Sequence, residues 1–256
     1  CSLRLVFKVA TRALKPNLHA IAGTLRFLFF ISLFLSVTVC RADFFCRKRD
    51  FAAADGLMQS HISNVQQDRN GFMWFATWNG LIRYDGYGFH TFKPILCSDN
   101  TIYSNRIYNI KNSSTGDMWC VSSDNRLFSF SSATCRFTDI QRRISCIDGK
   151  KVKVLTPLKN GYTWVTFKDY SCIRLSDADP LGRYRYFAAG SKSLKGSRRI
   201  YSICMDEEGN EWILTDRGAI NVSKGQFVPG QFRHVHSIAG YTVLISRDGT
   251  LLRMTS

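Results

Sequence analysis

The sequence has few prolines, few acidic residues and only short hydrophobic runs. It contains 5 Pro, and 19 Asp plus Glu stand against 35 Lys plus Arg in 256 residues. Hydrophobic residues make up 45% and aromatic residues 13% of the chain, which excludes disorder as a description of the whole. The apolar run Phe27–Val39 is about 13 residues long, shorter than the about 20 that a helix needs to cross a bilayer.

Motifs that carry chemistry are also scarce. The sequence has no glycine loop for a phosphate, no Ser/His/Asp order with a supporting context and no Cys-x-x-Cys pair. His234 and His236 would share one face of a strand, but a metal site needs more ligands than two. The acidic run 206–208 precedes Gly209 and is interpreted as part of a hairpin turn. We therefore predict no catalytic residue, no metal site and no cofactor.

The N-terminal region predicts export. Arg26 precedes the apolar run, and Cys40-Arg41-Ala42 follows it, which is typical of a signal peptide cut after Ala42. An uncleaved signal anchor is the alternative. Removal of residues 1–42 lowers the formal charge from +16 to +10, because it removes six basic residues and no acidic one. Export argues against nucleic acid as a partner. The remaining positive charge fits either a solvated surface or attraction to an anionic glycan or membrane.

Seven cysteines follow the predicted cut, and an odd number leaves at least one free thiol in an exported protein. Cys120 and Cys204 fall inside predicted buried strands, where Cys behaves as a small hydrophobic residue. The seven are Cys46, Cys97, Cys120, Cys135, Cys146, Cys172 and Cys204.

An internal repeat dominates the rest of the chain. Four segments begin at an apolar residue, carry Gly nine residues later and Trp twelve residues later. The Trp residues are 45, 45 and 48 residues apart, a spacing typical of stacked structural repeats. The repeated positions are Gly71 and Trp74, Gly116 and Trp119, Gly161 and Trp164, and Gly209 and Trp212.

Each unit reads as four short strands separated by turn residues. In the first unit these are Ile62–Gln67, Phe72–Thr77, Leu81–Asp85 and Phe89–Lys93. Units of about 45 residues with four strands and one recurring Trp indicate blades of a β-propeller, with the Trp packed between neighbouring blades. The predicted fold is an all-β, incomplete β-propeller in residues 43–256, with blades near 62–103, 107–148, 152–196, 200–230 and 234–256.

The last unit, from His236, lacks the Trp and has three strands. We expect about four and three-quarter blades of a seven-bladed ring, because a propeller closes by contact between its last and first blades. The chain also begins with Cys1 and not with Met. Both features are interpreted as those of a fragment of a longer gene product.

The first unit carries a specific sequence pattern. Residues 51–94 read F-x-x-x-DGL-x-Q, then QD-x-x-GF-x-W-x-x-T-x-x-GL-x-RYDGY-x-F. This stretch resembles the periplasmic propeller of hybrid two-component sensor histidine kinases from gut Bacteroidetes. Later units are more degenerate: Ser113 and Leu158 replace the Asp found at Asp68 and Asp206, and we interpret this as a repeat whose backbone matters more than its side chains.

The resemblance implies a larger parent protein and a sensory role. It implies a second propeller, a β-sandwich, a membrane helix and a histidine kinase on the same polypeptide, which would be a homodimer on the periplasmic side of the inner membrane. The ligand would be an oligosaccharide from glycan breakdown, and the output would be control of polysaccharide-utilisation genes. Two alternatives stay open: a propeller polysaccharide lyase or glycoside hydrolase, and a binding or scaffold propeller without signalling.

The ligand-binding residues are expected in loops on one face of the ring, because propellers bind ligands there. Trp78 is the fifth Trp, in a turn where the other units have Ser122, either Phe167 or Lys168, and Asp216. The predicted ligand-binding residues are Trp78, Asn79, Tyr103, Arg106, Lys168, Asp169, Tyr170, Asp216 and Arg217.

Overall fold

The computed structural model describes residues 51, 61–93, 104–238 and 241–254. They belong to one compact unit, Phe51–Ser256, and the other unit, Cys1–Asp50, lies outside the described residues. The predicted signal peptide, Cys46, Cys97 and Tyr103 therefore also lie outside them. No helix among the described residues is long and apolar enough to cross a membrane.

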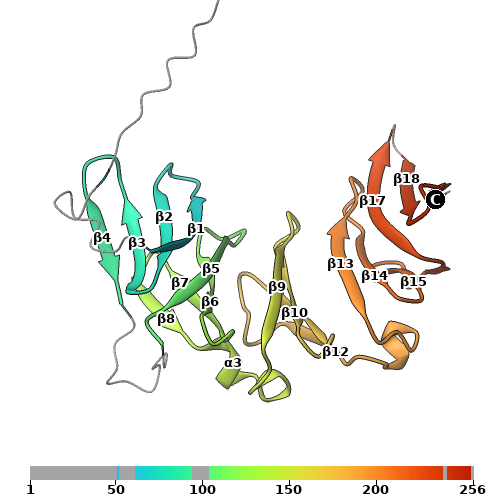
Figure 1. Ribbon diagram of the computed structural model, residues 1–256, viewed down its shortest axis with the longest axis horizontal. Coiled ribbons are helices and arrows are strands. Elements are labelled where there is room, and N and C mark those ends of the chain that lie inside the picture. The colour runs from blue at the N-terminus through green and yellow to red at the C-terminus, as the bar shows by residue number, and fades with distance from the viewer. Residues whose placement is uncertain (1–50, 52–60, 94–103, 239–240, 255–256) are drawn as a thin grey trace, which may run out of the picture. The chain divides into compact units, whose positions relative to one another are not determined.

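The described chain forms five antiparallel sheets in chain order (Figure 1). Each sheet is a meander in which consecutive strands are hydrogen-bonded neighbours. Sheet 1 contains β1 (Ile62–Gln67), β2 (Met73–Thr77), β3 (Gly80–Tyr84) and β4 (Phe89–Phe92); sheet 2 contains β5 (Ile107–Asn112), β6 (Met118–Ser122), β7 (Leu127–Ser131) and β8 (Arg136–Thr138); sheet 3 contains β9 (Val152–Pro157), β10 (Tyr162–Phe167), β11 (Cys172–Ser176) and β12 (Tyr184–Phe187); sheet 4 contains β13 (Ile200–Met205), β14 (Glu211–Thr215), β15 (Gly218–Asn221) and β16 (Phe227–Pro229); sheet 5 contains β17 (Phe232–Ile238), β18 (Tyr241–Ser246) and β19 (Leu251–Arg253).

The recurring glycine explains the turn between the first two strands of sheets 1 to 4. Its φ is +85° at Gly71, +97° at Gly116, +84° at Gly161 and +84° at Gly209. Glycine adopts this left-handed backbone without the steric cost that a Cβ imposes. In sheet 1 the Asp68 carboxylate also closes the turn, because its Oδ1 accepts hydrogen bonds from the backbone N–H groups of Asn70 and Phe72.

The recurring Trp side chains lie in four separate cores between successive sheets. Trp74 packs with Ile107 and Phe130 of sheet 2, and Trp119 packs with residues of sheet 3. Trp164 packs with residues of sheet 4, and Trp212 packs with residues of sheet 5. All four are at most 2% exposed. Burial of a side chain of this size on the facing sheet stabilises each junction by roughly 2–3 kcal/mol.

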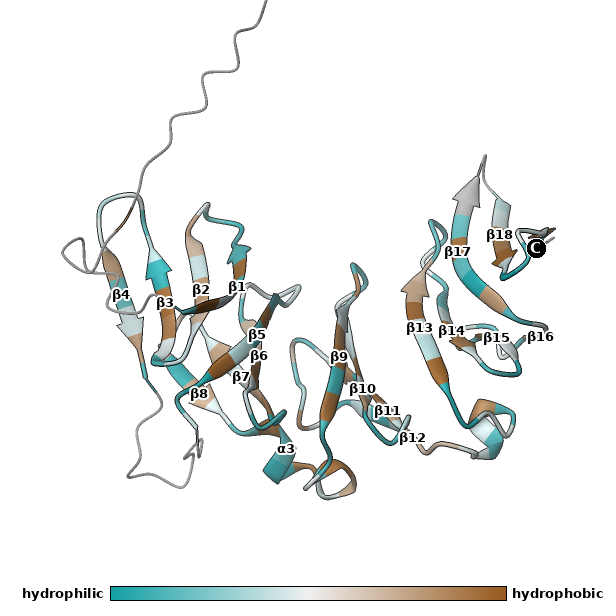
Figure 2. Ribbon diagram, in the orientation of Figure 1, coloured by the Kyte–Doolittle hydropathy of each residue, from teal (hydrophilic) through white to brown (hydrophobic). Residues whose placement is uncertain are grey.

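These features define incomplete β-propeller architecture, and the predicted all-β fold class is confirmed. The first strands of successive sheets contact one another, β1 with β5, β5 with β9 and β13 with β17. Figure 2 shows brown segments that alternate with white and teal ones along the strands, while the turns between them are mostly teal or white. Stacked four-stranded meanders that share a core at each junction are the repeating unit of a propeller.

Short helices occupy two of the connections between sheets. α3 (Ile140–Arg143) and η2 (Ser145–Ile147) join sheets 2 and 3, and η3 (Lys192–Leu194) joins sheets 3 and 4. Asp139 caps α3, because its side chain accepts a hydrogen bond from the backbone N–H of Arg142. These helices bury Ile140, Ile147 and Leu194, so the connections contribute to the cores.

The described cysteines are free thiols in different environments. Cys120 and Cys172 are fully buried, and burial raises the pKa of both thiols. Cys204, expected to be buried, is only partly buried and packs at the edge of the core between sheets 4 and 5. Burial raises its pKa to about 11.

Candidate ligand-binding end

Each sheet has two ends, and the predicted ligand-binding residues that the structure describes lie at one of them. We call the near end the one where the first strand begins and the second strand turns into the third; the far end is the opposite one. Hydrogen bonds join near ends of neighbouring sheets, from the N–H of Gly80 to the carbonyl of Asn105 (2.8 Å) and from the N–H of Val152 to the carbonyl of Asn125 (2.8 Å). Loops of neighbouring sheets therefore meet at the near end.

Trp78 lies in the β2–β3 turn and contacts two near-end side chains. Its ring centroid is 4.1 Å from that of His61, and the Arg106 guanidinium carbon lies 5.1 Å from the indole centroid. The Trp78 side chain is nevertheless 48% exposed. A half-exposed indole beside a guanidinium can pack against the apolar face of a sugar ring while the cation meets a hydroxyl or carboxylate group.

The neighbours of Trp78 are set by the turn geometry. The backbone N–H of Asn79 donates to Thr77 Oγ1 (3.1 Å), which holds the two-residue turn. The structure corrects one sequence alignment: β6 ends at Ser122, so the residue of sheet 2 that corresponds to Trp78 is Ser123. Ser123 donates its N–H to the Arg106 carbonyl at the same place in sheet 2.

Asp169 and Tyr170 lie in the β10–β11 turn of sheet 3 with two lysines. Lys150 Nζ is 2.5 Å from Asp169 Oδ2, and Lys153 Nζ is 4.5 Å from the centre of the Tyr170 ring. Burial favours a higher pKa for Asp169, but hydrogen bonds from Lys150 and Ser171 outweigh it and lower the pKa. Asp169 is therefore an ionised partner of Lys150, whose own pKa this hydrogen bond raises.

The backbone of Tyr170 is left-handed, with φ of +64°. The same turn position in sheet 2 is Asn125, also with φ of +64°, and Asn tolerates this conformation better than an aromatic residue. A non-glycine residue in this region costs roughly 1 kcal/mol or more. A tyrosine in this strained conformation is a candidate contact residue, and Lys168 lies in the same turn.

Asp216 and Arg217 form the corresponding turn of sheet 4. Asp216 Oδ1 accepts hydrogen bonds from the backbone N–H groups of Arg198 (3.1 Å) and Arg199 (3.2 Å). One Arg217 guanidinium nitrogen lies 3.4 Å from the Lys195 carbonyl. Asp216 thus connects the residues before β13 to the β14–β15 turn. Its Oδ1 is occupied by these two hydrogen bonds, so less of the carboxylate is free to accept hydrogen bonds from a ligand.

The structure brings the predicted residues together in three groups and adds residues that the sequence did not indicate. Trp78, Asn79 and Arg106 form the first group, the β10–β11 turn the second, and the β14–β15 turn the third. His61, Lys150, Lys153, Tyr201 and Arg247 were missed. Arg247 lies over the Tyr201 ring at 4.7 Å, so an aromatic ring beside a cation recurs at three places on the near end.

A backbone irregularity explains part of that recurrence. The first strand of every sheet shifts register just after its first residue, where it pairs with the second strand. A β-bulge turns a side chain out of the regular alternation. The extra residues are Ser63, Tyr108, Lys153, Tyr201 and Arg233, of which Tyr108 is 60% exposed. Four of these five bulge residues are tyrosine or basic, a repeat signal that was present in the sequence.

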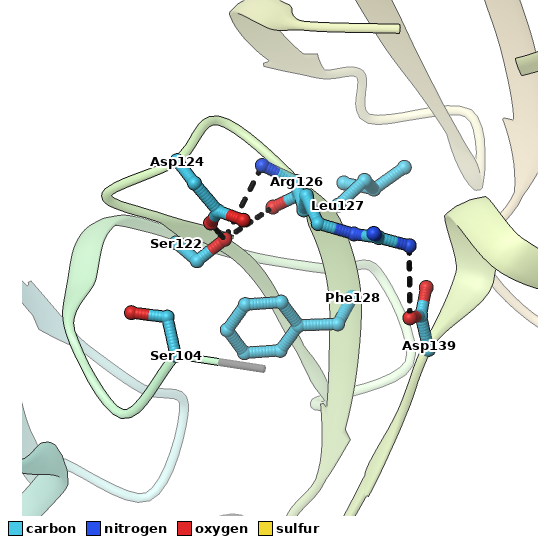
Figure 3. Close-up of a pocket in the computed structure, with 7 residues that line it drawn as sticks. All are labelled: Ser104, Ser122, Asp124, Arg126, Leu127, Phe128 and Asp139. Carbon is cyan, nitrogen blue, oxygen red and sulfur yellow. Dashed lines mark hydrogen bonds and ion pairs between the residues drawn. The ribbon is translucent and has the colours of Figure 1, made fainter. Parts of the chain in front are cut away.

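A second cluster of polar side chains at the near end, in sheet 2, leaves no space for a ligand. Figure 3 shows Ser122 hydrogen-bonded to Asp124 and Arg126, and Arg126 reaching Asp139 at 3.4 Å. The space between these side chains and Phe128 does not admit a water molecule. The cluster stabilises the β6–β7 turn and offers no room for a ligand.

The two histidines of β17 are not joined by further metal ligands in the described ranges. The rings of His234 and His236 lie 6.0 Å apart, and no group of three His, Cys, Asp or Glu side chains in the described ranges could hold a metal ion. The near end is instead suited to non-covalent binding, since it combines exposed aromatic rings with basic groups.

Comparisons with known proteins agree with this architecture. A β-propeller is the class that the fold defines. Within it, residues 56–79 match the sequence model of the two component regulator propeller family, which confirms the resemblance seen in residues 51–94. No curated protein sequence matches the chain.

Solved structures are similar to this chain at low sequence identity. The extracellular domain of the putative one component system BT4673 from B. thetaiotaomicron has 15% identity and a TM-score of 0.50, and the match covers 80% of this chain and 33% of that chain. The extracellular domain of the putative hybrid two component system BT3049 from the same organism has 16% identity and a TM-score of 0.40, over 77% of this chain and 34% of that chain. The chain thus spans about a third of the length of these proteins.

Proposed function

We propose that this chain is the ligand-sensing propeller of a membrane-bound hybrid two-component sensor histidine kinase. It is exported to the periplasmic side of the inner membrane, detects glycan breakdown products and thereby controls polysaccharide-utilisation genes. The rest of the polypeptide supplies a second propeller, a β-sandwich, a membrane helix and the kinase. The observation that carries this proposal is the regulator-propeller repeat at residues 56–79, which includes the exposed Trp78.

The near end supports oligosaccharide binding through three aromatic and basic pairs. Each pair offers an apolar ring surface for the sugar ring and a cation for its hydroxyl or carboxylate groups. Trp78 with Arg106, Tyr170 with Lys153 and Tyr201 with Arg247 are contributed by successive sheets or their junctions. An oligosaccharide that extends over two or more sheets could contact several pairs together.

Signalling requires that the ligand distinguish two arrangements of the receptor. A ligand shifts an equilibrium only by the difference between its affinities for the two states. In a homodimer, binding at the near ends would favour one arrangement of the propellers and so change kinase activity. Oligomeric assembly with the kinase is part of the same proposal.

The test is a titration of the chain with defined oligosaccharides by calorimetry, followed by Trp78→Ala. We expect the substitution to weaken binding at least about tenfold, which corresponds to about 1.4 kcal/mol. Tyr87→Ala is the matched control, because Tyr87 is 97% exposed but lies in the β3–β4 turn at the far end. Equal losses for the two variants, or no binding by any oligosaccharide, would contradict the proposal.

A signalling measurement separates this proposal from its alternatives. In cells that carry the intact gene, Trp78→Ala should reduce the transcriptional response to the binding oligosaccharide, while Tyr87→Ala should leave it unchanged. Shortened products released from a polysaccharide by the purified protein would instead indicate a lyase or hydrolase. Binding with no transcriptional response would indicate a scaffold propeller.

A further inference from the structure

A cavity of about 300 Å³ lies between sheet 2 and the β11–β12 connection of sheet 3, away from the near-end aromatic and basic pairs. That volume is at the lower limit of small-ligand sites. Its lining includes Trp119 and Ser129 on sheet 2, Arg143 of α3, and the acidic residues Asp117, Asp177 and Asp179. Three acidic groups against one basic group are unusual in a chain with a formal charge of +16.

The cavity coincides with a difference between the sheets. The residue opposite the recurring Trp on the third strand is Arg83 in sheet 1 and Arg174 in sheet 3. In sheet 2 it is Ser129, which pairs with Trp119. Directly opposed residues in an antiparallel pair point to the same face. Sheet 2 therefore lacks an arginine side chain where sheets 1 and 3 have one.

Sheet 3 shows what an arginine does at this position. Arg174 Nε lies 2.7 and 3.0 Å from the two carboxylate oxygens of Glu211 in sheet 4, and its guanidinium carbon lies 3.3 Å from the centre of the Tyr162 ring. Glu211 is 2% exposed, so a buried carboxylate of the following sheet is neutralised by an arginine of the preceding one.

The junction of sheets 2 and 3 has Thr163 where the next junction has Glu211, and its buried carboxylate is that of Asp177, just after β11. Asp177 of sheet 3 is 7% exposed, and it accepts hydrogen bonds from the Trp119 indole N–H (3.0 Å) and the Ser114 backbone N–H (2.7 Å). Thr163 donates a third (2.7 Å). A carboxylate can accept about four hydrogen bonds. Asp179 also lines the cavity, and its Oδ1 accepts a hydrogen bond from the Gly182 backbone N–H (2.9 Å).

We propose that this cavity binds a guanidinium group, supplied by free arginine or by an arginine side chain of a peptide. The ligand would occupy the space that Arg174 fills in sheet 3, with its cation between Asp177 and Asp179. A guanidinium fits better than an ammonium, because it is planar, donates to carboxylates in a bidentate manner and packs on aromatic rings.

The test is calorimetric titration of the 256-residue chain with L-arginine, with L-citrulline as the uncharged analogue of the same shape. We expect arginine to bind at least about tenfold more tightly than citrulline, because citrulline cannot neutralise the carboxylates. Equal binding of both, or no binding of arginine at tens of millimolar, would overturn the proposal. N-acetyl-arginine amide distinguishes the two sources of the guanidinium group. If it binds more tightly than L-arginine, the ligand is an arginine side chain of a peptide; if it binds more weakly, the ligand is free arginine.

Four substitutions locate the site. Ser129→Arg should fill the cavity and abolish arginine binding, whereas Ser129→Ala should preserve it. Asp179→Asn should weaken binding about tenfold, and Arg143→Ala should strengthen it by removing the competing cation. Thermal unfolding monitors the fold of each variant. If Ser129→Arg unfolds, Asp179→Asn decides: unchanged affinity in that variant shows that arginine binds elsewhere.

Discussion

The recurring Trp lies in the same kind of core in sheets 3 and 4, but in the part of the chain that the structure describes its indole N–H has a hydrogen-bond partner only in sheet 4. In sheet 4, Trp212 Nε1 donates to Asp206 Oδ2 at 2.9 Å. In sheet 3, Leu158 takes the place of that Asp, and Trp164 Nε1 is buried without a hydrogen-bond partner among the described residues. A buried unpaired donor costs about 1–3 kcal/mol. The packing of the Trp is thus common to both junctions, while its polar contact is not.

The other two sheets extend this comparison. Sheet 1 resembles sheet 4, because Trp74 Nε1 donates to Asp68 Oδ2 at 2.7 Å. Sheet 2 has Ser113 at that position, and Trp119 instead donates to Asp177 of the next sheet. The acceptor can therefore come from the same sheet or from its neighbour, and in the second case the hydrogen bond also joins the two sheets.

The largest expected effect is that of Asp206→Ala. Asp206 accepts hydrogen bonds from Trp212, from the Asn210 backbone and side chain, and from Thr242 of sheet 5 (3.0 Å), and it is 5% exposed. Removal of this buried network should lower the free energy of unfolding by about 3 kcal/mol. Urea unfolding measures it. Glu208→Ala in the same turn is the control and should cost less than about 1 kcal/mol, because Glu208 is exposed.

Trp→Phe substitutions compare the two junctions directly. Both Trp212→Phe and Trp164→Phe lose ring volume, but only the first removes an indole N–H that has a partner. We expect Trp212→Phe to lower the free energy of unfolding by about 1–2 kcal/mol more than Trp164→Phe. Similar losses in urea unfolding would mean that the Asp206 contact contributes little.

Transfer of the carboxylate to sheet 3 should produce a smaller effect. Leu158→Asp and Leu158→Ala both lose the leucine, which packs against the core between sheets 3 and 4. Only the Asp variant can accept the hydrogen bond of Trp164. At neutral pH its free energy of unfolding should therefore be about 1 kcal/mol higher than that of the Ala variant. The reverse order in thermal and urea unfolding would show that burial of the new charge outweighs the hydrogen bond.

Much of the fold could be predicted, because the repeat encodes it locally. The predicted strand Ile62–Gln67 matches β1, and the predicted ends of the next three strands differ from those of β2 to β4 by at most one residue. The recurring Gly lies where a positive φ is needed, and the recurring Trp lies in the cores between sheets. The positions of the turns and of the buried residues can be read from the recurring Gly and Trp of the repeat itself.

The side-chain contacts between sheets could not be predicted from the same repeat. Asp68 and Asp206 have a side-chain role that the sequence interpretation did not include, because both carboxylates accept the Trp hydrogen bond. Asp177 lies 58 residues from Trp119 in the sequence, and no periodic pattern marks it. At the near end, Trp78 was evident as an unrepeated Trp, but Lys153 over Tyr170 depends on a bulge and a left-handed turn.

The pH dependence of stability gives the smallest and most specific test of the Asp206 contact. Burial favours a higher pKa for this carboxyl, but the hydrogen bonds from Trp212, Asn210 and Thr242 outweigh it and lower the pKa below its ordinary value. A group whose pKa is lower in the folded state binds more protons when unfolded, so its contribution is complete above the unfolded pKa of about 3.9 and is lost as the pH falls through the folded value.

Asp206→Asn keeps the shape of the side chain and removes this titration. The difference in free energy of unfolding between the wild type and Asp206→Asn should be constant from pH 7 to about 5 and should shrink below about pH 4. Other carboxyls, including Asp85 with its pKa lowered to about 2, titrate in both proteins and cancel in the difference. Urea unfolding at a series of pH values measures it. A difference that stays constant to pH 3 would mean that Asp206 does not bind its partners as an ionised group.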